Sequence, residues 1–262
     1  MRLDSADDCA EPMTHDRGCS LSLSSPPMQD PKEPEPLWLE VDRALEDWLG
    51  PEDAALRSAT ASAKRAEMPA IAVAPAQGRT LQVLARAISA RRILEIGTLA
   101  GYSAIWLARA LPADGRLVTL EIDPERALVA RENLARAGLS ERSEVVVGPA
   151  ADSLEALIRA KIAPFDMIFI DADKRNCPLY LKHSLALART GSLIVVDNAI
   201  SRGRLIDPST GDPDANGLRA MMELVSHHPR LEAACVQTVG AKGYDGFLIA
   251  TVVEERIGAA GR

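Results

Sequence analysis

FDMIFIDADK, residues 165–174, is an apolar run that ends abruptly in carboxylates, and GSLIVVDN, residues 191–198, ends in a similar way. Both runs have the composition of buried strands. The carboxyl ends of neighbouring parallel strands lie at one edge of a sheet, so Asp171, Asp197 and Asn198 are expected to meet there, with Lys174 nearby. Each Asp could instead cap the helix that follows it. Two such strand ends together favour a hard-metal site with a base beside it.

Strands and helices alternate on both sides of these runs. Strands are expected at 92–96, 116–121, 143–147, 165–170 and 191–196, with helices at about 102–111, 124–137, 151–161, 176–189 and 215–228. Helices are also expected at 37–49, from Pro51 to about Ala66, and from Arg79 to Ala90 after an irregular stretch at 68–78. This alternation predicts an α/β fold, a Rossmann-like, doubly wound, mainly parallel sheet of seven strands. Residues 231–239 and 247–253 flank the Gly-rich GAKGYDG, so they predict a hairpin whose last strand is antiparallel to its neighbour.

Length and composition indicate one large domain. The chain has 262 residues, of which 47% are hydrophobic, which suffices for a full α/β core. Residues 1–36 are rich in Ser, Pro and Asp without periodicity, so they predict a disordered extension before a domain at 37–262. Translation starting at Met13 or Met28 is an alternative account of this segment.

The net charge indicates which partners the chain does not favour, and the cysteines indicate the redox state of its surroundings. The net charge of −7 comes without a basic block, which argues against nucleic acid and does not favour anionic membranes. No apolar run approaches a membrane span, and the N-terminus lacks the apolar core of a secretory signal. The four cysteines, at 9, 19, 177 and 235, have no metal-ligand spacing and predict free thiols in a reducing cytoplasm.

A glycine turn follows the first strand, in RRILEIGTLAGYSA. Gly97 and Gly101 are spaced G-x-x-x-G, so the dinucleotide pattern G-x-G-x-x-G is absent, and a purely structural tight turn is one alternative. Glu121 ends the second strand and stands where a carboxylate accepts hydrogen bonds from ribose hydroxyls, unless it is simply a solvated acid. Turn and acid together favour a nucleoside ligand without a pyrophosphate.

The third strand ends at Gly148, beside the small residues Pro149 and Ala150, where a flat adenine ring could lie. We expect Asp152 to cap the next helix. At the acidic edge, Asp171, Asp173, Asp197 and Asn198 supply the oxygen ligands that Mg²⁺ and Ca²⁺ prefer. Near a divalent cation the pKa of Lys174 would fall, which would allow a neutral amine to act as general base, although most lysines are simply solvated.

From about Trp38 to Val253 the chain resembles the metal-dependent, S-adenosylmethionine (SAM)-dependent O-methyltransferases, the group of caffeoyl-coenzyme A and catechol O-methyltransferases and their bacterial relatives. The motifs that carry the resemblance are AVAPAQG, LEIGTLAGYSAIWLARALP, LEIDPE, VGPAADSL, FIDADK, VVDNAISRGR and YDGFLIA. Their order and separations make the resemblance specific, because no one of them would suffice alone.

The resemblance implies a role for each matching residue. It places Val73, Glu95, Gly97, Tyr102 and Ser103 along the methionine part of SAM, Glu121 on the ribose, Ile122, Gly148, Pro149 and Ala150 around the adenine, and Asp171 also in contact with the cofactor. It implies a divalent cation on Asp171, Asp197 and Asn198, usually Mg²⁺, with Ca²⁺ or Mn²⁺ as alternatives, and Lys174 as the base. It also implies a homodimer, because members are often dimers.

The reaction expected is a methyl transfer from SAM to a hydroxyl of a small phenolic molecule, most plausibly a catechol whose vicinal oxygens bind the cation. Two alternatives are a nicotinamide-dependent oxidoreductase, against which the missing G-x-G-x-x-G argues, and a non-catalytic module that has kept the cofactor pocket. The retained set of Asp171, Lys174, Asp197 and Asn198 argues against the second alternative.

Overall fold

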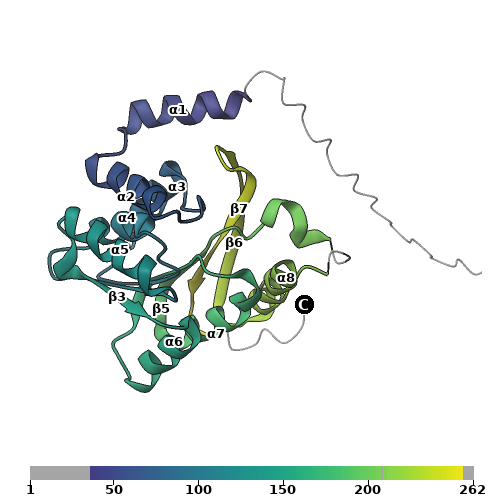
Figure 1. Cartoon of the computed structure of the whole chain (residues 1–262). Helices are drawn as coiled ribbons and strands as arrows, with labels where there is room; N and C mark the ends of the chain where they lie inside the picture. Colours follow the sequence, from purple (N-terminus) through teal and green to yellow (C-terminus); the bar gives the residue numbers. More distant parts are fainter. Residues whose placement is uncertain (1–35, 208, 210, 256–262) are drawn as a thin grey trace, which may run out of the picture. The chain divides into compact units, whose positions relative to one another are not determined.

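A seven-stranded sheet forms the centre of the structure, a computed structural model that describes residues 36–207, 209 and 211–255 (Figure 1). The extension expected at 1–36 therefore lies outside the described residues, apart from Pro36. The strands are β1 (Arg92–Ile96), β2 (Arg116–Glu121), β3 (Ser143–Val147), β4 (Phe165–Ile170), β5 (Ala188–Val196), β6 (Leu231–Gly240) and β7 (Gly243–Val252).

The strand order in the sheet is β3-β2-β1-β4-β5-β7-β6. Strands β1 to β5 pair in parallel, whereas β7 is antiparallel to both β5 and β6, so the predicted sheet and closing hairpin are confirmed. The chain leaves β1 toward β2 and β3 on one side and returns to β4 and β5 on the other. This reversal opens a crevice at the carboxyl ends of β1 and β4, which is where parallel α/β sheets bind ligands.

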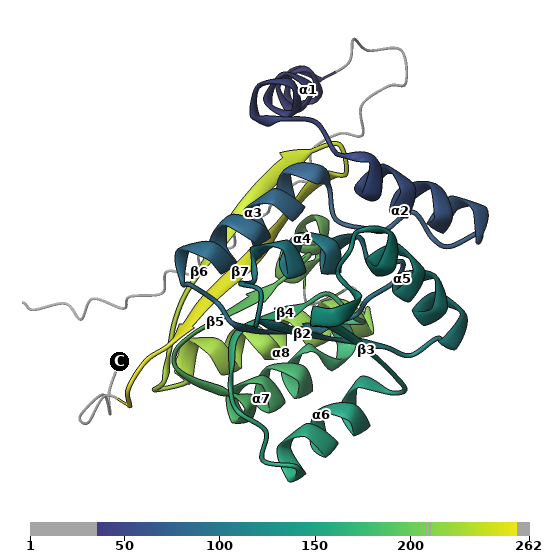
Figure 2. The same ribbon diagram turned by 90° about the vertical axis from the view of Figure 1, so that its left-hand side faces the viewer.

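Helices cover both faces of the sheet (Figure 2). One face carries α2 (Ala54–Arg65), α3 (Pro75–Ala87), α4 (Tyr102–Ala110) and α5 (Pro124–Arg136), and the other carries α6 (Ala150–Arg159), α7 (Cys177–Leu187) and α8 (Pro213–His227). Every residue of β4 is buried, and its side chains alternate between the two cores: Met167 and Phe169 join the first, Ile168 and Ile170 the second. Burial on both faces explains why the strand reads as a continuous apolar run.

Local signals set several helix starts. The carboxylates of Asp53, Asp123 and Asp212 accept hydrogen bonds from the first backbone amides of α2, α5 and α8. Prolines stand in the first turn of α3, α5 and α8, where the missing amide hydrogen costs nothing because it would have no partner. Helix α1 (Leu37–Leu49) lies next to the tip of the β6–β7 hairpin, and it has no buried residue (Figure 1).

Several predicted boundaries were wrong. Strand β5 begins at Ala188, three residues before the expected start at 191, and α7 ends at Leu187 instead of 189. Helix α3 begins at Pro75, four residues before the expected Arg79, because a proline at the first helical position is compatible with a helix. Helix α6 begins at Ala150 after Pro149, so Asp152 lies in the first turn rather than at the cap, where its charge complements the helix dipole. The Gly-rich segment forms a two-residue turn, Ala241 and Lys242, because Gly243 already belongs to β7.

The remaining described elements are short 3₁₀ helices, η1 (Ser140–Arg142), η2 (Lys174–Asn176) and η3 (Ser201–Ile206). Cys177 and Cys235 are free thiols, as predicted, whereas Cys9 and Cys19 lie outside the described residues. In the described part of the chain, every helix is too short or too polar to span a membrane.

Candidate active site

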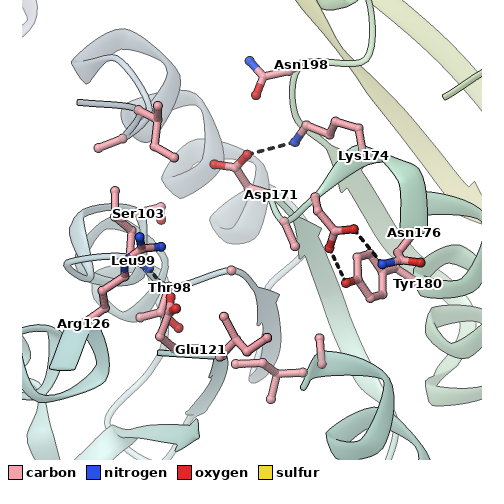
Figure 3. Close-up of a pocket in the computed structure, with 18 of the residues that line it drawn as sticks. Thr98, Leu99, Ser103, Glu121, Arg126, Asp171, Lys174, Asn176, Tyr180 and Asn198 are labelled. Atoms are coloured by element: carbon pink, nitrogen blue, oxygen red, sulfur yellow. Dashed lines mark hydrogen bonds and ion pairs between the residues drawn. The ribbon is translucent and has the colours of Figure 1, made fainter. Parts of the chain in front are cut away.

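A cavity of about 790 Å³ lies in the crevice at the carboxyl ends of the central strands. Gly97 after β1, Glu121 at the end of β2, Pro149 before α6 and Asp171 after β4 all line it. Figure 3 shows Ser103 and Glu121 on one side of the cavity and Asp171, Lys174 and Asn198 on the other. The two groups of residues singled out in the sequence therefore share one cavity, because the sheet brings their strand ends together.

The turn after β1 is held in an unusual backbone conformation. Gly97 has φ 101°, and a Cβ atom there would lie 2.4 Å from the carbonyl oxygen of Asp171, so only glycine fits where β1 and β4 approach each other. Leu99 also has positive φ, 49°, and its backbone N–H donates to Glu121 Oε2 at 2.8 Å. Asp123 N–H donates to the other oxygen at 3.1 Å, so two amides orient the buried Glu121 carboxylate.

The end of the cavity next to β2 and β3 is largely apolar. Ile122, Pro149 and Ala150 line it, and Ile122 is 67% exposed, which leaves one face of its side chain available to a flat ring. Gly148 does not line the cavity; its φ of 142° and its hydrogen bond to the Glu121 carbonyl, 2.9 Å, shape the turn instead. The predicted adenine residues are therefore adjacent, with Gly148 behind the cavity wall.

Glu95 lies below the cavity and not in its lining, although the resemblance placed it along the cofactor. Its side chain is fully buried and accepts a hydrogen bond from Thr119 Oγ1 at 2.5 Å, while Oε1 has no partner. Burial raises the pKa of Glu95 to about 8, and the nearby hydroxyls of Ser103 and Thr119 oppose that rise. Ser103 does line the cavity and connects this buried acid to it.

Val73 and Tyr102, which the resemblance assigned to the methionine part of the cofactor, both line the cavity. The hydroxyl of Tyr102 donates to Glu52, in the loop before α2, which anchors the tyrosine at the cavity wall.

The acidic strand ends lie together at the other end of the cavity. The backbone N–H of Asp171 donates to Ile96 O at 2.8 Å, and that of Asp197 to Ile170 O at 3.0 Å, so each acid extends its strand pairing by one residue. Lys174 Nζ donates to Asp171 Oδ1 at 3.1 Å (Figure 3). Asp197 is buried and does not line the cavity itself, whereas Asp171, Lys174 and Asn198 do.

The charges of Asp171, Lys174 and Asp197 shift the pKa values of Asp171 and Lys174. Burial raises the pKa of Asp171 to about 6, and the charge of Lys174 opposes the rise while that of Asp197 adds to it. Burial acts to lower the pKa of Lys174, but the carboxylates of Asp171 and Asp197 have the larger effect. The pKa of Lys174 is therefore raised. In this arrangement Lys174 is therefore an ammonium group paired with Asp171.

The donor set fits a hard divalent cation. Asn198 has φ 50°, a conformation that asparagine tolerates, and its amide nitrogen donates to Asp245 Oδ2 at 3.3 Å, which leaves the amide oxygen for a cation. Both hydrogen bonds accepted by Asp197, from Gln77 and from its neighbour's N–H, use Oδ1 and leave Oδ2. Among the described residues, His, Cys, Asp and Glu do not gather in threes that could hold a metal, so the set depends on Asn198.

Asp173 does not join this set. Its two oxygens accept hydrogen bonds at 2.6 Å from Tyr180 Oη and from Asn176 Nδ2 (Figure 3). It therefore fixes the turn that carries Lys174 instead of offering a metal ligand.

Reasoning from the sequence missed several residues. Gln77 on α3 donates to Asp197, and the cavity lining also includes Thr98, Leu99, Arg126, Asn176, Tyr180 and Asp214. Gln77 stands in the quoted motif AVAPAQG, and the positions of Thr98 and Leu99 inside the glycine turn were a usable signal. The others lie on helices or in turns, where only the packing brings them to the cavity.

Comparisons with known proteins identify relatives over most of the chain. Residues 51–250 match the O-methyltransferase family. A catechol O-methyltransferase from Mycobacterium tuberculosis is 50% identical over 81% of this chain and 95% of its own. The structure of an O-methyltransferase from Bacillus cereus in complex with SAH is 47% identical, with TM-score 0.81 over 82% of this chain and 98% of that one. A SAM complex of the O-methyltransferase TomG from Streptomyces achromogenes is 45% identical, with TM-score 0.81 over 83% and 98%.

Fold, cavity and similarity over most of the chain lead to one conclusion: this protein belongs to the O-methyltransferase family.

Proposed function

We propose that the protein transfers a methyl group from SAM to one hydroxyl of a catechol, with a divalent cation held by Asp171, Asp197 and Asn198. One observation carries the proposal: a single cavity has an apolar end at Pro149 and Ala150, and an end with an acid, an amide and an amine at Asp171, Asn198 and Lys174. The relative named catechol O-methyltransferase supports the acceptor, and the relatives solved with SAH and SAM support the methyl donor.

The position of each residue in the cavity sets the role that we propose for it. Glu121, oriented by two backbone amides, accepts hydrogen bonds from ribose hydroxyls, and Ile122, Pro149 and Ala150 flank the adenine. Val73, Gly97, Tyr102 and Ser103 enclose the methionine part, with Glu95 beneath them. Asp171 belongs to the acidic end but lies directly beside Gly97 of the methionine part, so it borders both the methyl donor and the acceptor.

A bound divalent cation, Mg²⁺ or alternatively Ca²⁺ or Mn²⁺, would lower the pKa of a catechol hydroxyl. A cation held by Asp171, Asp197 and Asn198 would offset the carboxylate charges that keep Lys174 protonated. Lys174, which lines the acceptor end, would then be a neutral amine able to remove the hydroxyl proton as general base. The acceptor oxygen then attacks the methyl carbon in line with the departing sulfur, so its positioning accounts for much of the acceleration.

The alternatives differ in measurable ways. Family membership argues against a nicotinamide-dependent oxidoreductase. A non-catalytic module would bind SAH but would not turn over catechols.

The test of the cation is direct. We expect activity on a catechol to fall to background in excess EDTA and to return with Mg²⁺. Asp171→Asn and Asp197→Asn should each lower kcat/KM by about a hundredfold or more, because a lost charge weakens both cation binding and acceptor activation. The exposed pair partner Asp114→Asn is a matched control that should keep activity. Full activity in excess EDTA would rule out the role proposed for the cation.

We also propose that the protein acts as a homodimer. Helix α1 carries five exposed apolar side chains: Leu37, Val41, Leu45, Trp48 and Leu49. The side chain of Trp48 is 79% exposed. The neighbouring hairpin adds exposed apolar residues Val236, Val239 and Tyr244. A contiguous apolar surface of this kind is typical of a protein interface, and a second copy of the chain is the occupant that we propose.

A further inference from the structure

The tip of the β6–β7 hairpin lies beside the cavity. Ala241 N–H donates to Asp42 Oδ2 of α1 at 3.1 Å, and Lys242 Nζ donates to the carbonyl oxygen of Ile71 at 3.0 Å. Ile71 itself lines the cavity, together with the Ala72 that follows it. Both views of the fold show this tip close to α1 (Figures 1 and 2). The hairpin therefore brings the ammonium group of Lys242 to the rim of the cavity.

The charge of Lys242 acts on the acidic end of the site. Burial lowers the pKa of Lys242, and the carboxylates of Asp197, Asp171 and Asp245 oppose that effect. The influence is mutual, because Lys242 also acts to lower the pKa of Asp171. The geometry places the hairpin beside this end of the site, because Asp245, three residues after Lys242 in the chain, accepts a hydrogen bond from Asn198 at 3.3 Å.

Lys242, at the rim, differs in its partners from the cations that line the cavity. Lys174 is paired with Asp171 at 3.1 Å, Arg175 with Asp214 at 3.3 Å, and Arg126 with Asp123 at 3.6 Å. Within the described part of the chain, Lys242 has no carboxylate within ion-pair distance, and its hydrogen bond is to a neutral carbonyl. Lys242 as a residue is exposed, while the surrounding protein partly desolvates its ammonium group. An ammonium group has three donors, so two remain for a ligand.

We propose that Lys242 binds an anionic substituent of the methyl acceptor, so that the protein prefers catechols that carry a carboxylate over neutral ones of the same shape. This inference rests on the proposed catechol methylation. A carboxylate would give Lys242 the charged partner that the folded chain does not supply, through a charge-assisted hydrogen bond. The vicinal hydroxyls would remain at Asp171 and Asn198, at the far end of the same molecule.

A pair of matched acceptors tests the proposal: 3,4-dihydroxybenzoate, which is anionic, and the neutral 3,4-dihydroxybenzamide. We expect the wild type to show a KM about tenfold lower for the acid, the size of one charge-assisted hydrogen bond. Lys242→Met should raise the KM for the acid about tenfold, change that for the amide less than twofold and leave kcat similar. Lys242→Arg should retain the preference. Lys182→Met, an exposed lysine on α7 outside the cavity lining, controls for a lost positive charge.

Three results would overturn the inference. Equal KM values for the acid and the amide in the wild type would show that the carboxylate is not recognised. An equal loss on both acceptors in Lys242→Met would mean that Lys242 only holds the hairpin against Ile71. A weaker affinity for SAH in that variant, measured by calorimetry, would assign Lys242 to the methyl donor. If the wild type methylates neither compound, the proposed function fails independently of Lys242, and the inference fails with it.

Discussion

At the scale of single residues, Lys174 has the most direct consequence for the chemistry. Its ammonium is paired with Asp171, and both side chains are mostly covered, 13% and 20% exposed, where they line the cavity. We expect Lys174→Met to lower kcat by about 10²- to 10⁴-fold, the range of a lost general base, and to leave SAH affinity within about twofold. Stopped assays and calorimetry measure the two quantities. A large loss of SAH affinity with little change in kcat would instead make Lys174 a cofactor-binding residue.

Glu95 allows a prediction about stability. Its pKa is raised to about 8 in the folded chain from an ordinary value of 4.5, so between these pH values the folded chain retains a proton that the unfolded chain releases. The proton on Glu95 therefore stabilises the folded chain fully below about pH 4.5. This stabilisation is lost as the pH rises toward 8.

Glu95→Gln removes this titration. The Tm of the variant relative to wild type should rise steadily between pH 5 and pH 8, as measured by thermal unfolding in matched buffers. The same change at an exposed helix position, Glu125→Gln, corrects for the general loss of a negative charge. A Tm difference that is constant with pH would mean that Glu95 is ionised in the folded protein.

At the scale of elements, the contact between α8 and η2 controls where Lys174 lies. A Cβ atom on Gly217 of α8 would lie 2.3 Å from the carbonyl oxygen of Lys174 and 2.6 Å from Arg175 Cα, closer than packed atoms approach. Asp214 at the start of α8 also accepts the backbone N–H of Arg175 at 3.1 Å. The helix and the turn are therefore positioned as a unit.

Gly217→Ala should displace this turn. We expect a destabilisation of about 1–3 kcal/mol from overpacking, together with a fall in kcat that exceeds any change in SAH affinity. The exposed Glu223→Ala on the same helix controls for a change of residue in α8. Unchanged kcat and stability would show that η2 moves freely to accommodate the added methyl group.

The start of helix α3 was predicted too late from the sequence, and a contact of the site was missed as a result. The two prolines in 68–78 predicted an irregular segment, but Pro75 is the first residue of the helix and Gly78 packs within it against Trp106. Because the helix starts early, Gln77 lies on it and reaches Asp197. A boundary error of four residues therefore hid a contact of the site.

At the scale of the whole molecule, the exposed surface of α1 predicts assembly. Light scattering after size-exclusion chromatography should give twice the 28.1 kDa mass of the chain. Trp48→Asp should shift the protein to the mass of one chain, because a charge in an apolar interface is costly. The exposed Glu40→Gln on the same helix is a control that should remain dimeric. A wild type that is monomeric at micromolar concentration would contradict the proposal.

The sequence by itself determined the order of strands and helices, the closing hairpin and the acids at the ends of β4 and β5, because periodicity, caps and turn residues act over a few neighbouring positions. Only the tertiary structure decided which distant groups meet those acids. Gln77 and Asp197 are 120 residues apart, Lys242 and Ile71 are 171 apart, and neither contact has a local signal. The packing of helices and hairpin on the sheet sets such contacts, and the same packing buries Glu95 beneath the cavity and turns Asp173 away from the acids.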